Sequence, residues 1–393
     1  MSARHLARLL VAFVLLGVLV SFARRVGAVE RNFAGSGQFD YHYVVNGQSP
    51  GGITPRDGFT TELALKVAVD VTDKVSANVK VCYGCHGFEV PMAHLDYRVA
   101  DELNFRVGRF SPSLGAFNLR HDPANHRLSS KPLIYDMGRM LRKNEWNMGV
   151  LPSPFPDNGV EVSGTHWFGE SVQLDYALYA VSGFKAASDA TDLDFQLNRQ
   201  PYYTDNNSRP TVGGRLALTF KLGEASDLTV GGSSQYGTFD PDRKQSYWFY
   251  GADASLRLSR TNIRVEWLAR RQTFDASDPT RFAYVVPKDG GDFFVKQGGY
   301  AEIEHPLGKK VDGVFRYDVM YRTGNVLVGS ELRRQSAVQR FTVGAMVTVD
   351  RAFRVKASTE IWQFSDPEPG DKLAPRSDVS HAVAFHLGVV GTY

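Results

Sequence analysis

Both cysteines of this 393-residue chain lie in one short motif, Cys82-Tyr83-Gly84-Cys85-His86. Two thiols at this spacing, followed directly by a histidine, form the C-x-x-C-H pattern of c-type haem attachment. In that chemistry the thiols of Cys82 and Cys85 add to the two haem vinyl groups, and His86 is the proximal ligand of the iron. The motif therefore predicts one covalent haem c held by Cys82, Cys85 and His86.

Two other uses of the motif stay open. In an exported protein, Cys82 and Cys85 can close a small disulfide, with His86 incidental to it. A zinc site needs further ligands, and the sequence has no second Cys/His pair at a metal-binding spacing. The spacing favours haem over a disulfide, and a disulfide over zinc.

A distal ligand of the iron has to come from elsewhere in the chain. In the segment 89–99, Met92 and His94 share one face and lie close to the motif in sequence. We expect His94 as the distal ligand, with Met92 as the alternative and a five-coordinate iron also open. Further histidines that could approach the site are His42, His121 and His126.

Residues 1–28 have the organisation of a secretory signal peptide. Arg4 and Arg8 precede an apolar run from Leu9 to Ala23, and small residues offer a cleavage site after Ala28. An uncleaved N-terminal anchor is the alternative. Under either interpretation the protein is exported.

Composition excludes two classes of function. The chain has 45 basic and 42 acidic residues, and residues 1–28 hold four arginines and no acid, so the mature chain has a net charge of −1. We therefore expect no nucleic-acid partner, because that needs a strongly basic surface. A mean hydropathy of −0.26 and a single long apolar run exclude a bundle of transmembrane helices.

Alternation of apolar and polar residues recurs along the chain after Gly35. Leu63, Leu65 and Val67, for example, alternate with Ala64 and Lys66. Such period-two patterns indicate β-strands. We expect about sixteen strands, at 35–46, 58–72, 75–83, 89–99, 103–110, 159–169, 171–183, 211–222, 226–238, 244–259, 261–275, 292–305, 310–323, 335–349, 351–365 and 379–393.

The connections between these strands alternate in length. Short ones such as 73–74 and 101–102 alternate with long polar ones such as 111–158 and 184–210. Seven short and eight long connections fit an up-and-down barrel with periplasmic termini and long outer loops. The predicted fold class is all-β: a transmembrane antiparallel β-barrel of about 16 strands over residues 29–393, surrounded by the lipid of a Gram-negative outer membrane.

Two segments resemble phosphate-selective porins. They are the hairpin 94–110, which ends in Val107-Gly108-Arg109-Phe110, and the return segment 157–162. The resemblance implies a 16-stranded homotrimeric barrel in which 111–158 folds into the lumen and narrows it; a solvated outer loop is the alternative. It does not imply phosphate, because a lumenal ladder of lysines and arginines is not evident. The C-terminal segment 386–393 is similar to the signal read by the barrel-assembly machinery.

Strand phase predicts which side chains point into the lumen. On 75–83, Lys80 and Cys82 share the polar face, so Cys82 should point inward. The residues that we expect to line the pore are Lys80, Arg98, Arg106, His121, His126, Arg264 and Arg316. Acids such as Asp40, Glu62, Asp96, Glu266 and Asp318 alternate with them, so no ion selectivity is predicted.

The combination of barrel and haem motif is similar to the fused cytochrome-porins of the outer membrane. That resemblance implies electron transfer at or across the membrane, with a periplasmic cytochrome or an extracellular redox partner. The alternative is a general diffusion porin for small hydrophilic solutes or anions, with a Cys82–Cys85 disulfide. An enzyme is not expected, because the chain has no G-x-S-x-G or comparable nucleophile motif.

Overall fold

The computed structural model describes residues 31–45, 58–84, 87–136, 149–151, 153–185, 193, 204–273, 284–285, 293–324, 326–327, 337–365 and 381–393. The predicted signal peptide at 1–28 lies outside the described residues, as do Cys85 and His86.

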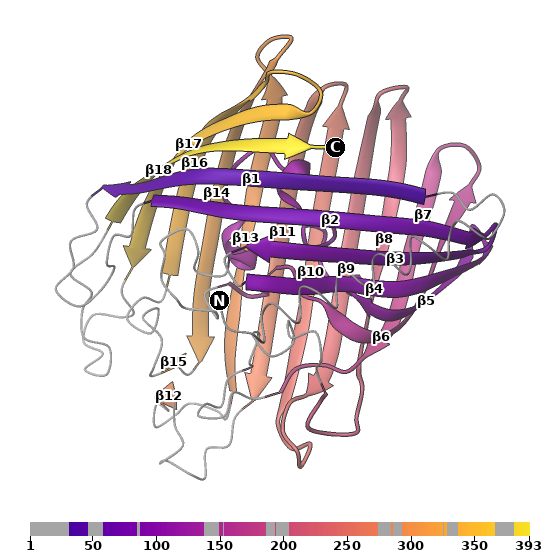
Figure 1. The fold of residues 1–393 in the computed structure, drawn as a ribbon. Helices are drawn as coiled ribbons and strands as arrows, with labels where there is room; N and C mark the ends of the chain where they lie inside the picture. The colour runs from indigo at the N-terminus through magenta and orange to yellow at the C-terminus, as the bar shows by residue number, and fades with distance from the viewer. Residues whose placement is uncertain are drawn as a thin grey trace, which may run out of the picture.

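Sixteen antiparallel strands form one closed barrel, in which β1 pairs with β18 (Figure 1). The strands are β1 (Arg31–Val45), β2 (Gly58–Thr72), β3 (Val75–Gly84), β4 (Gly87–Ala100), β5 (Leu103–Phe110), β6 (Asp157–Phe168), β7 (Val172–Val181), β8 (Thr211–Gly223), β9 (Ser226–Thr238), β10 (Ser246–Leu258), β11 (Thr261–Thr273), β13 (Phe293–Pro306), β14 (Val311–Gly324), β16 (Ala337–Thr348), β17 (Phe353–Ser365) and β18 (His381–Thr392). Two short strands, β12 (Tyr284–Val285) and β15 (Val326–Leu327), pair with each other in a separate sheet. The predicted fold class and strand number are confirmed.

Tight turns join the strands at one end of the barrel, which we call the short-turn end. Between β2 and β3, the hydroxyl of Thr72 accepts hydrogen bonds from the amides of Lys74 (3.3 Å) and Val75 (3.0 Å). Between β6 and β7, Gly169 has φ 65°, a left-handed conformation that favours glycine. The opposite end, where the long connections lie, is called the long-loop end.

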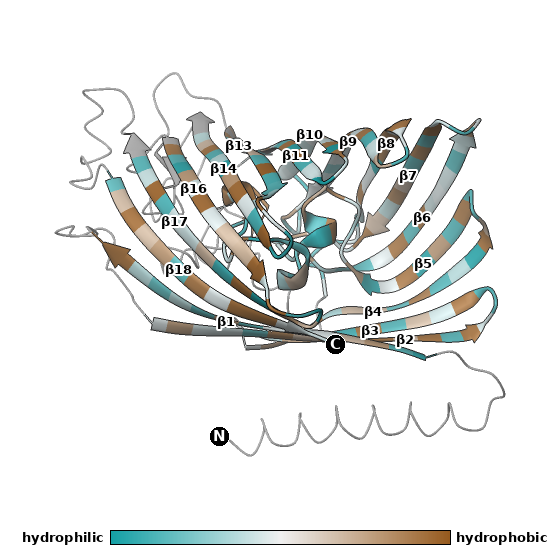
Figure 2. Ribbon diagram, turned by 90° about the horizontal axis from the view of Figure 1, so that it is seen from above, coloured by the Kyte–Doolittle hydropathy of each residue, from teal (hydrophilic) through white to brown (hydrophobic). Residues whose placement is uncertain are grey.

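The two faces of the barrel differ in chemistry. Hydropathy alternates along the strands, so that one face is apolar and the other polar (Figure 2). Exposed apolar side chains of the outer face include Leu63, Leu95, Phe105, Val107, Leu178, Leu216, Val265, Phe315, Val343, Ile361, Phe385 and Leu387. A closed barrel with this outer face satisfies its backbone hydrogen bonds internally, as a membrane requires. Within the described part of the chain, no helix is long and apolar enough to cross a membrane.

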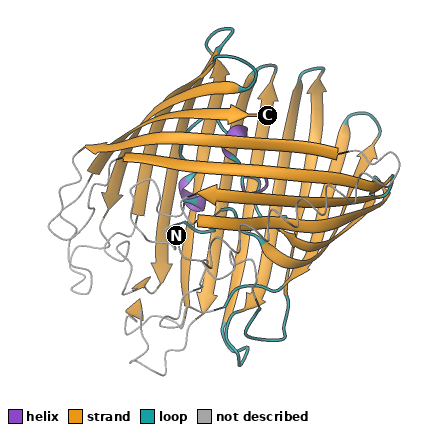
Figure 3. Cartoon of the chain, in the orientation of Figure 1, coloured by secondary structure: helices purple, strands orange, loops and turns teal. Residues whose placement is uncertain are grey.

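The segment after β5 lies inside the ring of strands (Figure 3). It contains three short 3-10 helices, η1 (Asn118–Arg120), η2 (Pro123–Asn125) and η3 (Leu133–Tyr135). Its apolar side chains pack with inward-facing ones of the wall into a buried core, which includes Leu114, Phe117, Leu133, Ile134, Tyr135, Phe155, Phe249, Leu268, Met320 and Trp362. The inward fold of 111–158 is thus confirmed for its described residues; 137–148 and 152 lie outside them.

Candidate functional site in the barrel interior

Glu266, on β11, holds the first part of the inward loop. Its carboxylate accepts hydrogen bonds from the amides of Ala116 (2.7 Å) and Phe117 (3.2 Å) and from the hydroxyls of Tyr135 and Tyr300, the latter at 3.1 Å. The side chain is only 2% exposed. A buried carboxylate is costly unless donors surround it, and here four donors do so. Glu266 therefore fixes the loop to this wall.

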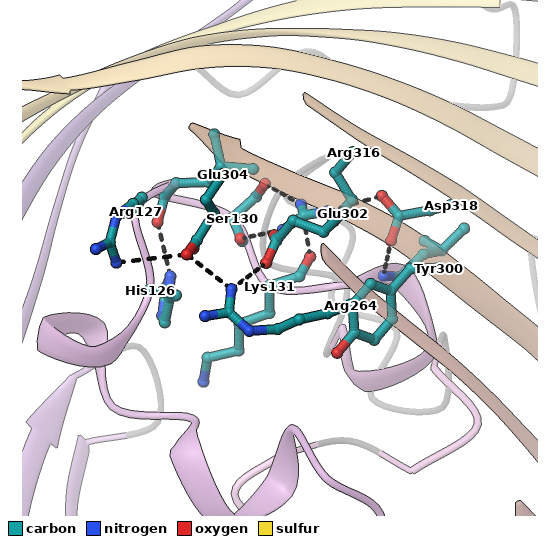
Figure 4. Close-up of polar contacts among 12 residues, drawn as sticks. His126, Arg127, Ser130, Lys131, Arg264, Tyr300, Glu302, Glu304, Arg316 and Asp318 are labelled. Atoms are coloured by element: carbon teal, nitrogen blue, oxygen red, sulfur yellow. Dashed lines mark hydrogen bonds and ion pairs between the residues drawn. The ribbon is translucent and has the colours of Figure 1, made fainter. Parts of the chain in front are cut away.

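Asp318, on β14, organises the next anchor (Figure 4). Its Oδ1 accepts a hydrogen bond from the amide of Leu133 at 2.8 Å, and its Oδ2 accepts one from the Nε of Arg316 and one from that of Arg340, each at 3.0 Å. Both arginines also donate to the carbonyl of Lys131, at 3.2 and 2.6 Å. Because all three charged side chains are buried, they act on the loop and not on water.

The ion pairs continue along the wall toward the short-turn end (Figure 4). Arg264 on β11 lies 3.2 Å from Glu302 and 2.8 Å from Glu304, both on β13. Arg127 of the loop lies 3.6 Å from Glu304 and 3.2 Å from Asp312. Arg127 and Asp312 are partly exposed, so this end of the network meets water.

Strand β17 and strand β1 hold the loop at residues 123–129. The ammonium of Lys356 donates to the carbonyls of Pro123 (2.7 Å) and Leu128 (3.3 Å). The hydroxyl of Ser129 donates to Asp40 of β1 at 2.8 Å. Lys356 is 1% exposed, so the loop carbonyls take the place of its hydration.

The loop also reaches the opposite wall. Lys80 on β3 forms an ion pair with Asp122 of the loop. In the ring of sixteen strands, β3 is eight places from β11, which carries Glu266, so the two lie across the lumen from each other. The loop therefore spans the lumen between opposite walls and narrows it.

The wall at β4–β6 keeps charges in contact with water. Arg106 donates to Asp96 at 2.7 Å and to Glu161 at 3.2 Å, and Glu161 also accepts from the loop amide of Ser113 at 3.2 Å. The side chain of Arg106 is 34% exposed and that of Asp96 is 27% exposed. These groups of both signs face the remaining passage.

Two loop histidines are buried and neutral near pH 7. Burial lowers the pKa of His121 to about 4, and Lys80, whose Nζ lies 3.5 Å from its Nε2, acts in the same direction, while Asp122 opposes it. Burial, followed by Lys356, lowers the pKa of His126 well below its usual value. In both, a protonated ring would stand beside a lysine.

The expected pore lining needs a correction. Arg316 of the wall and the loop residues His121 and His126 lie in the barrel interior, but all three are buried where the loop meets the wall and do not line water. Lys80 is buried in its ion pair with Asp122, and Arg98 is exposed at the short-turn end beside Asp101. Of the expected residues, Arg106 and Arg264 keep partial exposure in the interior. Anchoring residues that the sequence did not single out are Tyr135, Arg340, Lys356 and Glu360.

The haem motif occupies the hairpin of β3 and β4. The strands stay paired up to Gly84 and Gly87, with the undescribed Cys85 and His86 between them. Cys82 has a free thiol and pairs in register with Glu89. The charged groups that act on it are Lys80, Asp122, Glu62 and Glu89, all on the lumenal side, in agreement with its predicted inward direction.

The described surroundings of Cys82 are charged, and the other two residues of the motif, Cys85 and His86, lie outside the described part of the chain. Four charged groups act on the Cys82 thiol. Covalent haem at Cys82, Cys85 and His86 stays a prediction of the motif. Among the described residues, no three His, Cys, Asp or Glu side chains gather to hold a metal ion.

The expected distal ligands are displaced from the motif. His94 pairs with Asn78, and its ring nitrogens face the carbonyl of Arg109 (3.3 Å) and the carboxylate of Asp96 (3.3 Å). Met92 pairs with Lys80, across a register shift that separates it from Glu89. The shift places Val90 and Pro91 in a bulge. The sequence signal for this bulge is Pro91, because proline has no backbone N–H to donate to the strand ladder.

Comparisons with known proteins identify the fold. No family model and no curated protein matches the chain. Among solved structures, the outer membrane channel DcaP of Acinetobacter baumannii has a TM-score of 0.57 at 12% identity, covering 93% of this chain and 97% of that one. The anion-selective porin from Comamonas acidovorans has a TM-score of 0.56 at 10% identity, covering 93% and 100%. Salmonella typhi OmpF has a TM-score of 0.57 at 10% identity, covering 92% and 97%. The chain has the barrel fold of outer-membrane porins.

Proposed function

We propose that this protein is a general diffusion porin of the Gram-negative outer membrane for small hydrophilic solutes. The observation that carries the proposal is the inward loop, held between opposite walls by Glu266 on one side and Lys80 on the other. A loop fixed in this way sets the width of the passage. The loop 111–158 is therefore the proposed size filter.

The interior chemistry supports passive diffusion without a strong preference for either ion sign. The partly exposed interior groups are of both signs, for example Arg106 beside Asp96 and Arg127 beside Asp312. Charges of both signs along a pore replace part of the hydration of polar solutes and favour neither cations nor anions strongly. We propose no phosphate specificity, because Arg316 and Arg340 are engaged by Asp318 and the loop.

The proposed assembly is a homotrimer in the outer-membrane lipid. One structural neighbour, OmpT of Vibrio cholerae, has been solved in a trimer form, with a TM-score of 0.52. The apolar outer face of the present barrel suits contact with lipid and with further copies of the chain.

Haem-based electron transfer is the second candidate function. The C-x-x-C-H spacing alone favours it, with a periplasmic cytochrome or an extracellular redox partner as electron donor or acceptor. The charged surroundings of Cys82 support the diffusion porin instead.

Reconstitution of the full chain in planar lipid bilayers tests the porin. We expect stepwise conductance increments, together with liposome swelling by small sugars that falls off sharply as the sugar grows. Absence of both, in a preparation whose heat-modifiable migration on gels shows a folded barrel, would overturn the proposed function.

A further inference from the structure

Four histidines are buried where the inward loop meets the barrel wall. His121 and His126 belong to the loop, whereas His42 is on β1 and His386 on β18. None is more than 7% exposed. Imidazole is the side chain whose charge changes near neutral pH, and two of these rings, those of His121 and His126, belong to the loop itself.

On the wall, His42 and His386 face each other. They are register partners on adjacent strands, and their ring centroids are 4.2 Å apart. The Nε2 of His386 lies 3.3 Å from the carboxylate of Glu360, which also bonds to Ser130 of the loop. Glu360 thus joins His386 of the wall to the loop.

On the loop, each histidine faces a cation of the wall. His121 lies beside Lys80 of β3, and His126 lies near Lys356 of β17. The ring of His126 also contacts Phe117, with centroids 5.8 Å apart, so an apolar neighbour adds to the cost of charging it. The other charged groups that act on the two loop histidines are Asp122 and Lys131 of the loop and Arg316 on β14.

We propose that the two loop histidines, His121 and His126, make the constriction acid-sensitive: the loop stays docked near neutral pH, and acid charges these rings beside the wall lysines and releases the loop from the walls. The inference deepens the proposed porin function, because it assigns a regulation to the same constriction. Released from β3 and β17, residues 120–131 no longer narrow the passage.

The direction of the effect follows from proton linkage. The docked loop holds the pKa of His121 at about 4, below its usual 6.5, and that of His126 lower than usual as well. The docked state therefore binds fewer protons than the released state. Docking is at full strength above about pH 6.5 and weakens as the pH falls toward 4. His121 alone weakens the docking equilibrium by about tenfold to a hundredfold at pH 4.5.

A nitroxide spin label on the loop tests release directly. Asn125 is an exposed loop residue, so Asn125→Cys in a Cys82→Ser, Cys85→Ser background can carry the label without disturbing the buried contacts. Between about pH 7.5 and about pH 4.5 we expect the mobile fraction in the resonance spectrum to rise about tenfold or more. Bilayer conductance of the unlabelled protein should rise over the same range.

Variants separate the histidines from other acid effects. In His121→Gln with His126→Gln, both rings that face wall lysines are lost, and the pH-dependent rise in label mobility should shrink about tenfold. If that pair misfolds, the single variants His121→Gln and His126→Gln should each reduce the rise by a smaller factor. His166→Gln is the matched control, since His166 is half-exposed near the short-turn end, and it should leave the rise unchanged.

Two results would overturn the proposal. One is an immobile label down to about pH 4.5 in a heat-modifiable barrel, and the other is a mobility change that persists unaltered when both loop histidines are glutamine. The spin label does not depend on conduction. Acid release without any conductance would therefore refute the porin and leave the release intact, whereas constant mobility in a conducting channel would refute the release alone.

Discussion

Two parts of the interior wall carry similar residues and use them differently. On β11–β17, acids and arginines such as Asp318, Arg316 and Arg340 are buried and bonded to the loop. On β4–β6, Asp96 and Arg106 are also paired, yet their side chains are 27% and 34% exposed. The first wall holds the constriction, and the second faces the solute.

The difference shows that inward direction and contact with water are separate properties. Strand phase decides that Arg316 and Arg106 both point inward. Whether an inward charge lines water depends on what the loop covers. The following predictions test this division between an anchoring wall and a solute-facing wall.

The largest effect is expected for Asp318→Ala. The change removes the acceptor of the Leu133 amide and leaves Arg316 and Arg340 buried without their shared carboxylate. Removing one partner of a buried ion pair costs about 3–5 kcal/mol, and here that cost weakens the docking of the loop. Single-channel conductance should rise and become noisy. The control is Asp227→Ala, whose partner Arg257 is half-exposed; a similar rise there would contradict the assignment.

A smaller effect of the same kind is expected for Glu266→Gln. The amide keeps the shape of the side chain but loses the charge that four donors share. Hydrogen bonds to a charged group contribute about 1.5–3 kcal/mol each, and the neutral amide retains part of that. Conductance should rise less than in Asp318→Ala. Tyr300→Phe removes one of the four donors, together with the hydroxyl that accepts a hydrogen bond from Arg120 at 2.9 Å, and serves as the graded control. An effect larger than that of Glu266→Gln would refute the carboxylate as the anchor.

Arg106→Gln should change selectivity and not pore size. It removes a partly exposed cation and leaves Asp96 and Glu161 in place, so the passage becomes more negative. The reversal potential in a salt gradient should shift toward cations, by about twofold in permeability ratio. Arg98→Gln, at the exposed short-turn end, is the control. A shift toward anions in Arg106→Gln would be incompatible with a solute-facing β4–β6 wall.

The smallest effect is expected for Cys82→Ser combined with Cys85→Ser. The thiol of Cys82 takes part in none of the described anchors of the loop, so conductance and solute size limit should remain those of the natural protein. A haem-peroxidase stain of the natural protein, made in a host that attaches haem c, decides between the diffusion porin and haem-based electron transfer. A stained band, lost in the variant together with redox activity, would establish the haem and refute the simple porin.

The barrel could be predicted from sequence because its pattern is local. Strict period-two alternation and short polar turns place β2, β5 and β9 at the boundaries expected for them. Turn residues such as Asp73 and Lys74 mark where a strand ends. Each of these signals lies within a few residues of the element it defines.

The interior could be predicted only in part, because it depends on contacts between distant segments. The alternation of side chains along each strand places Arg316, Arg340 and Lys356 on the inward face. No signal in the neighbouring sequence shows that carbonyls of the loop will cover them. The same holds for His126, whose lysine neighbour, Lys356, comes from a distant strand. The bulge at Pro91 could have been inferred, since a proline inside a strand interrupts its ladder.

The solute size limit of a loop-released variant tests the central claim most directly. Liposome swelling with sugars of increasing size can compare the natural protein with the double variant Glu266→Gln, Asp318→Asn, in which both anchors on the wall facing Lys80 are weakened. If the docked loop sets the passage, the variant should admit sugars that the natural protein excludes. An unchanged size limit, in a variant whose loop label is mobile, would show that the loop is not the constriction.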